Sequence, residues 1–76
     1  MKNTFETKDL YLASLFYAKG IKLSDIRRDG RECFFIFNDQ EKCNEIEKHY
    51  WSKEETVNAK EYTDAVKTLK GLLFIR

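Results

Sequence analysis

The dipeptide Asp29-Gly30, between two segments rich in apolar residues, is the feature that most constrains how this chain folds. Asp-Gly accepts the positive φ angles of a two-residue type I′ turn, so it predicts a β-hairpin with strands over residues 21–28 and 31–37. That turn would set Arg28 opposite Arg31 and Ile26 opposite Cys33. One face of the hairpin would then be apolar and meet helices, and it would carry Ile26, Cys33, Phe35 and Phe37. The other face would be mixed, with Leu23, Asp25, Arg27, Glu32, Phe34 and Ile36.

A strand and a helix are predicted before the hairpin. Residues 4–6 fit a short strand, and the Thr7 hydroxyl is suited to cap a helix that begins near Lys8. Apolar residues cover most of that helix's circumference, which predicts a central helix buried on several sides. Gly20 predicts the end of the helix, since glycine readily takes the left-handed conformation that follows a helix C-terminus.

Two more helices are predicted after the hairpin. Asn38 and the residue three positions on, Glu41, form a capping box for a surface helix with a narrow apolar stripe. Asn58 with Glu61 is the N-terminal signal of a last, amphipathic helix, and a break is expected between Trp51 and Val57. Whether residues 72–75 continue that helix or dock as a tail stays open.

Length and composition fit one compact domain over residues 1–76. The chain has 42% apolar and 36% charged residues, no proline and no internal repeat, so nothing indicates a linker or a second domain. The element order β-α-β-β-α-α predicts an α+β fold, with a short antiparallel sheet of two or three strands packed by about three helices. Strand order does not follow from the sequence.

Compartment and redox state are inferred from what the chain lacks. It has no apolar run long enough for a membrane span and no signal-peptide pattern, so we expect a cytoplasmic protein without membrane association. Disulfide-dependent small domains usually carry four or more cysteines, whereas this chain has two, Cys33 and Cys43. Both are expected to be buried reduced thiols.

Several local patterns occur together along nearly the whole chain. They have the form F-x-T-x-D-L-x-L-A from Phe5, a glycine at Gly20, R-x-x-F-F-x-F from Arg31, Tyr50-Trp51, Val57-Asn58-Ala59-Lys60, and L-K-x-L-L from Leu69. In this combination the chain resembles an uncharacterised family of small bacterial and phage domains, classed as a domain of unknown function. The resemblance implies a compact cytosolic domain, often of phage or mobile-element origin. It supplies no catalytic residue.

The sequence contains no recognisable catalytic, metal-binding or cofactor-binding pattern. Cysteine and histidine ligands lack metal-site spacing, and the three glycines are not clustered into a phosphate-binding loop. Cys33 with His49 could be imagined as a nucleophilic pair, but a cysteine in an aromatic strand is far more often a core residue. We therefore expect a non-enzymatic protein with no cofactor, no metal and no indicated small-molecule substrate.

Basic residues around the hairpin give the leading functional hypothesis. Residues 19–31 hold five basic against two acidic residues, whereas residues 32–61 hold eight acidic against four basic ones. Arginines on a β-ribbon can contact phosphates, so the pattern favours nucleic-acid association through a basic hairpin. The residues proposed for this are Arg27, Arg28, Arg31, Lys22 and Lys19. The alternative is that these cations only pair with nearby acids or keep the hairpin tip hydrated.

A second hypothesis is a protein-interaction or homodimerisation module. The mixed hairpin face and the Trp51 region would supply an apolar patch, because Trp, Tyr and Arg are common interface anchors. The residues proposed for it are Leu23, Phe34, Ile36 and Trp51. Salt separates the two hypotheses, since phosphate-dominated binding weakens steeply with added salt.

Overall fold

The computed structural model describes residues 3–74 as three strands and three helices, and confirms the predicted α+β fold and element order. The three strands form one antiparallel sheet in the order β1-β3-β2, with the C-terminal strand of the hairpin in the middle. The elements are β1 (Thr4–Thr7), α1 (Leu10–Ala18), β2 (Leu23–Asp29), β3 (Glu32–Asn38), α2 (Gln40–Trp51) and α3 (Ala59–Leu73).

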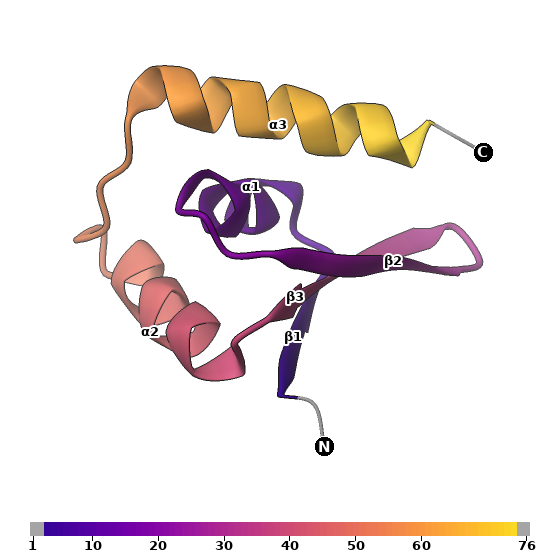
Figure 1. Cartoon of the computed structure of the whole chain (residues 1–76), viewed down its shortest axis with the longest axis horizontal. Helices are drawn as coiled ribbons and strands as arrows, with labels where there is room; N and C mark the ends of the chain where they lie inside the picture. The colour runs from indigo at the N-terminus through magenta and orange to yellow at the C-terminus, as the bar shows by residue number, and fades with distance from the viewer. Residues whose placement is uncertain (1–2, 75–76) are drawn as a thin grey trace.

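Helix α1 is the central element, as its apolar circumference predicts. It lies between the sheet and α3, while α2 packs beside it and the other face of the sheet is left without a helix (Figure 1). Five consecutive residues of α1, from Leu12 to Phe16, are buried, so neighbours contact this helix on several sides. By contrast α2 buries only Cys43 and Ile46, which confirms a surface helix with a narrow stripe.

The N-caps of α1 and α2 were each predicted too early in the sequence. Asp9, not Thr7, caps α1, and its Oδ1 accepts from the backbone N–H groups of Tyr11 and Leu12 at 2.9 and 3.2 Å. Thr7 instead accepts from the Asp9 N–H at 3.1 Å. Likewise Asp39, not Asn38, caps α2 and accepts from the Lys42 N–H at 3.2 Å. Asn38 ends β3, where the sheet holds its backbone.

The other helix boundaries follow the sequence signals. Gly20 has a φ of 90°, and the Ile21 N–H donates to the Phe16 carbonyl at 3.0 Å, the long hydrogen bond of a Schellman motif. Asn58 caps α3 by accepting from the Glu61 N–H at 3.0 Å. This helix continues through Leu73, which answers the open question for 72–73, while residue 75 lies outside the described residues.

The hairpin forms, but its turn is one residue further along the chain than predicted. Asp29 pairs with Glu32 and Arg28 with Cys33, so the two central turn residues are Gly30 and Arg31. Gly30 has a φ of 64°, and Arg31 is not among the described residues with positive φ. This matches a type II′ turn, which places glycine first, rather than the type I′ turn expected of Asp-Gly.

The shift moves the pairing by two positions, so most side chains keep their predicted face. The exception is Leu23, because a register irregularity between Leu23 and Asp25 places it opposite Phe37 and packs it against the core. Its assignment to the mixed face was therefore wrong. An extra residue in one strand reverses the faces of everything beyond it, and the sequence carries no clear signal for such a bulge.

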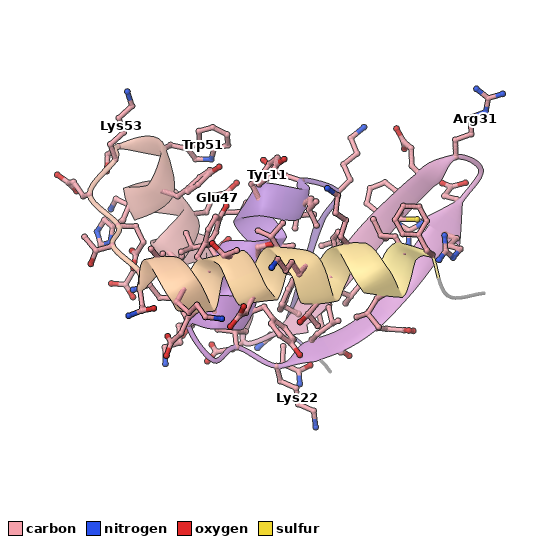
Figure 2. All side chains as sticks on the ribbon, turned by 90° about the horizontal axis from the view of Figure 1, so that it is seen from above. Tyr11, Lys22, Arg31, Glu47, Trp51 and Lys53 are labelled. Carbon is pink, nitrogen blue, oxygen red and sulfur yellow. The ribbon has the colours of Figure 1, made fainter. Side chains whose placement is uncertain are left out.

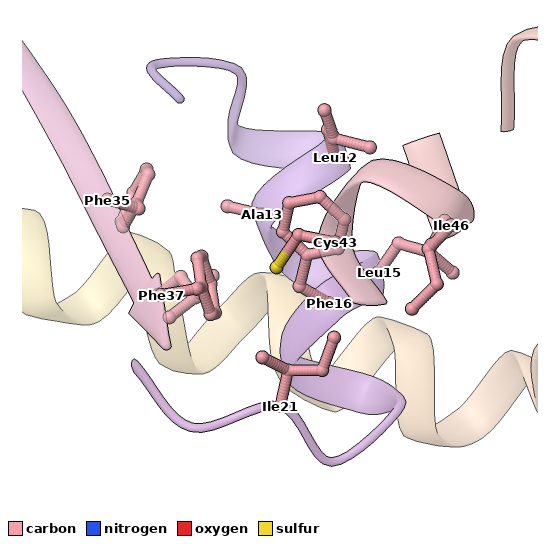
Figure 3. Close-up of a cluster of buried hydrophobic side chains, with 10 residues drawn as sticks. Leu12, Ala13, Leu15, Phe16, Ile21, Phe35, Phe37, Cys43 and Ile46 are labelled. Atoms are coloured by element: carbon pink, nitrogen blue, oxygen red, sulfur yellow. The ribbon is translucent and has the colours of Figure 1, made fainter. Parts of the chain in front are cut away.

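The core is an aromatic centre between α1, β3 and α2 (Figure 3). The Phe16 ring meets Phe5 edge-on at a centroid distance of 5.1 Å and Phe37 at 5.2 Å. Cys43 is fully buried within this core, and Cys33 is half-buried; neither forms a disulfide. The expectation that both cysteines are buried is therefore correct for Cys43 and wrong for Cys33.

Candidate functional site

Arg27 of the proposed nucleic-acid set lies on the helix-free face of the sheet and is engaged there. Its Nη2 donates to Glu6 Oε1 at 2.9 Å, and its guanidinium lies 4.5 Å from the centroid of the Phe34 ring. The hydrogen bond with Glu6 raises the pKa of Arg27 above its already high ordinary value. This arginine therefore acts as a cover for Phe34, with its charge directed at a carboxylate within the chain.

Arg28, the next residue, points to the opposite face. Its Nη2 donates to the backbone carbonyl of Leu73 at 2.9 Å, and its Nη1 donates to Cys33 Sγ at 3.1 Å. A cation bonded to a last-turn carbonyl satisfies a group that the helix leaves unpaired. Arg28 therefore links the hairpin to the C-terminal end of α3.

The other three proposed cations are spread over the molecule. Lys19 forms an ion pair with Glu55, far along the chain in the segment between α2 and α3. Arg31 at the hairpin tip and Lys22 before β2 project away from the body at different margins, as labelled in Figure 2. No ion pair of these two occurs among the described residues. The fold does not bring the five cations together into one basic surface.

The proposed interaction patch is also divided. Leu23 belongs to the helix-covered side, while Phe34 and Ile36 are half-buried on the helix-free face. Trp51 lies at the C-terminal end of α2, beyond the sheet (Figure 1). These four residues therefore form no single surface, because Trp51 lies apart from the other three.

Trp51 lies instead on an aromatic surface that it shares with Tyr11 of α1. Trp51 is 64% exposed and Tyr11 is 54% exposed, and both project from the same margin of the molecule, with Glu47 close by (Figure 2). The neighbouring Tyr50 packs edge-on against Trp51 at a centroid distance of 5.0 Å. Half-buried Tyr62 of α3 donates its hydroxyl to the Tyr11 carbonyl at 3.1 Å. We call Tyr11, Tyr50, Trp51 and Tyr62 the aromatic surface.

Two tyrosines of the aromatic surface have shifted acidities. Burial, followed by the negative charge of Asp9, raises the pKa of Tyr50, and burial together with Tyr50, Asp9 and Tyr11 raises that of Tyr62. These phenols therefore stay neutral well above neutral pH. Sequence reasoning missed Tyr11 because it stands in an almost continuous apolar run, where nothing distinguishes the exposed residues Tyr11 and Tyr17 from their buried neighbours.

A metal site, a nucleophilic Cys43 and a membrane-spanning helix would each require features that residues 3–74 do not show. No three His, Cys, Asp or Glu side chains of this part of the chain lie close enough together to hold a metal ion. Cys43 is no candidate nucleophile, because burial, followed by the charge of Asp39, raises its pKa to about 11. None of the helices within 3–74 is long and apolar enough to cross a membrane.

The fold and surfaces define a small α+β domain with a three-stranded antiparallel sheet covered by helices on one face. A family model matches residues 2–75, and the chain belongs to that family, which is described as a domain of unknown function (DUF5659). No curated protein and no solved structure matches the chain. The family membership confirms the expected resemblance to a domain of unknown function and assigns no activity.

Proposed function

We propose that this domain is a non-enzymatic module that binds another protein through its aromatic surface. The observation that carries the proposal is the joint exposure of Trp51 and Tyr11 at one margin of the molecule. Tryptophan and tyrosine are enriched among the residues that dominate binding energy at protein interfaces. Trp51 is about two-thirds exposed and lies outside the buried core, so core packing does not account for its position.

The aromatic surface is held in position rather than loose. Trp51 Nε1 donates to Glu47 Oε2 at 3.4 Å, the Tyr50 ring supports the indole from the side, and Tyr62 ties α3 to α1. A side chain that is already ordered loses less entropy on binding, so more of the contact energy appears as affinity. This pre-organisation favours a binding role over incidental exposure.

Charge indicates the chemistry of the partner. Asp9 and Glu47 flank the aromatic surface, and α2 carries three acidic residues against two lysines. Basic side chains would therefore be attracted here, and cations bind favourably over the faces of tryptophan and tyrosine. The partner proposed is a protein segment in which lysine or arginine alternates with apolar residues.

The test uses labelled peptides that alternate leucine with lysine, and matched peptides that alternate leucine with glutamate. Fluorescence anisotropy should show binding of the basic peptide to the wild type and at least a tenfold loss for Trp51→Ala, since interface tryptophans often contribute more than about 1.4 kcal/mol. Emission of Trp51, the only tryptophan of the chain, should change on binding. Phe74→Ala is the matched control, because Phe74 is also a highly exposed aromatic residue. Equal affinity of Trp51→Ala and wild type would contradict the proposal.

Nucleic-acid association is the second candidate, and it now depends on fewer residues. The observation in its favour is that Arg31 and Lys22 project from the hairpin region without an ion pair in the part of the chain described. Anisotropy titrations with labelled DNA and RNA at about 50 and 200 mM salt test it, because phosphate-dominated binding weakens strongly over that range. Loss of salt-sensitive binding in the Lys22→Ala, Arg31→Ala double variant would support it. No binding at the lower salt concentration would exclude it.

A further inference from the structure

A cleft of about 280 Å³ lies where the hairpin meets the start of α1 and the end of α3. Its size is just below the range of typical small-molecule sites, which begins at roughly 300 Å³. The residues that line it are Lys8, Leu10, Arg31, Glu32, Cys33, Phe35 and Leu73. It involves none of the aromatic surface, so a ligand here would be independent of the function proposed above.

The lining divides into an apolar part and a charged part. Leu10, Phe35 and Leu73 offer hydrocarbon and aromatic surface, and the half-buried thiol of Cys33 adds to it. Lys8, Arg31 and Glu32 supply the charges. A site of this composition suits a ligand with an apolar body and one polar end, because each part meets its own kind of surface.

The balance of charges favours an anionic polar end. Among the described residues that line the cleft, Glu32 is the only acid, and Lys8 neutralises it through an ion pair of 2.8 Å. Arg31 forms no ion pair within residues 3–74, which leaves one cation of the lining unmatched. Opposite charge on a ligand would complete that balance.

A second cation stands next to the cleft and strengthens the same preference. Arg28 donates to Cys33 Sγ at 3.1 Å and to the Leu73 carbonyl at 2.9 Å, and both of those residues line the cleft. The carbonyl groups at the C-terminal end of a helix carry partial negative charge that would repel an anion. Because Arg28 bonds one of these carbonyls, that repulsion is offset at the point where α3 reaches the cleft.

We propose that this cleft binds a small amphipathic anion, with the apolar body of the ligand against Leu10, Phe35 and Leu73 and its acidic group beside Arg31. The class is that of monoanionic carboxylic acids with a short hydrocarbon or aromatic body. Arg31 lines the cleft and its side chain extends outward from the hairpin tip (Figure 2), so a change of rotamer would let its guanidinium form a two-pronged contact with a carboxylate at the rim of the cleft.

Cys33 provides a direct readout of occupancy. Its thiol lines the cleft and is half-buried, whereas the other cysteine, Cys43, is fully buried and serves as an internal reference. The rate of alkylation of Cys33 by iodoacetamide, a neutral reagent, can be followed by mass spectrometry. A ligand seated in the cleft should slow that reaction and leave Cys43 unmodified throughout.

Three probes with the same tail test the preference for an anion: octanoate, octan-1-ol and octylammonium. We expect octanoate to protect Cys33 at the lowest concentration, octanol at a higher one and octylammonium least. Arg31→Gln should weaken protection by octanoate by about threefold to fivefold, the effect of one exposed charge contact, and leave octanol unchanged.

Lys53→Gln is the matched control, because Lys53 is another exposed cation that projects from the opposite end of the molecule (Figure 2). It should leave protection by all three probes unchanged. Equal protection by the three probes would overturn the proposal of an anion site, and absence of protection by octanoate would overturn the site itself. Because Trp51 plays no part in this assay, failure here leaves the proposed protein-binding role unaffected.

Discussion

The two faces of the sheet differ sharply in how they are covered, although β3 supplies aromatic side chains to both. On the helix-covered face Phe35 and Phe37 are 1% and 0% exposed. On the helix-free face the adjacent residues Phe34 and Ile36 stay half-buried, and the nearest cover is the Arg27 guanidinium. One face is therefore closed by apolar packing and the other by charged side chains. Similar aromatic residues of β3 should therefore contribute different amounts to the free energy of unfolding on the two faces.

The largest expected effect is the difference between Phe37→Ala and Phe34→Ala in the loss of free energy of unfolding. Truncation of a fully buried phenylalanine costs roughly 3–5 kcal/mol of the free energy of unfolding, through lost burial and the cavity left behind. Phe34→Ala should cost about 1 kcal/mol, because water and the flexible Arg27 can fill the space. Urea denaturation of both variants measures the two values.

Phe37→Leu is the control for a variant that fails to fold. A change that keeps most of the volume should cost less than about 1.5 kcal/mol, so its unfolding transition should remain measurable even if the alanine variant is unfolded. Equal losses for the alanine variants at positions 34 and 37 would show that the helix-free face is also an apolar interface, for instance against a second copy.

Alkaline pH should weaken the helix-covered core through Cys43. The pKa of this thiol is raised from 9.0 to about 11 in the folded protein, so the unfolded chain loses its proton first as pH rises. The stabilising contribution is therefore complete below pH 9 and is lost between about pH 9 and 11, at roughly 2–3 kcal/mol in total. Free energies of unfolding from urea titrations at pH 8, 9 and 10 would show the decline.

Cys43→Ala separates this effect from the ionisation of other groups. The variant should be less stable at pH 8 because a buried side chain is shortened, yet its stability should fall less steeply from pH 9 to 10. Tyr50 and Tyr62 titrate in both proteins and their pKa values are also raised, so they contribute equally to the two profiles. Parallel profiles for wild type and Cys43→Ala would contradict the assignment.

Local signals in the sequence predicted most of the fold. Three of these signals are the glycine after α1, the Asn58 cap and the periodicity of α3. Each depends only on residues close together in the sequence, so it can be recognised without the tertiary structure. The turn was displaced because Asp-Gly fits the type I′ form and Gly-Arg fits the type II′ form, and local chemistry alone does not decide between them. Strand order could not be predicted, because it depends on contacts between segments that are far apart in the sequence.

The candidate site was harder to predict than the fold. The adjacent arginines Arg27 and Arg28 look equivalent in sequence, but strand alternation sends them to opposite faces, where Glu6 and Leu73 engage them separately. Tyr11 had no distinguishing signal, and the cleft arises from three elements that are distant in the chain. Of the residues proposed from the sequence, Trp51 belongs to the aromatic surface, and Arg31 and Lys22 project from the hairpin region, whereas the other proposed cations are engaged within the chain.

The smallest expected effect concerns what Arg27 contributes to the helix-free face. Its ion pair with Glu6 is about half exposed and screened by water, so it adds little stability, whereas its stem and guanidinium also shield the Phe34 ring. Arg27→Met keeps most of the cover and removes the charge, so we expect it to cost less than Arg27→Ala in urea denaturation. The wild type should also lose slightly more stability than Arg27→Met as salt is raised, since screening weakens the pair. If Arg27→Met instead destabilised as much as Arg27→Ala, charge rather than cover would hold this face together.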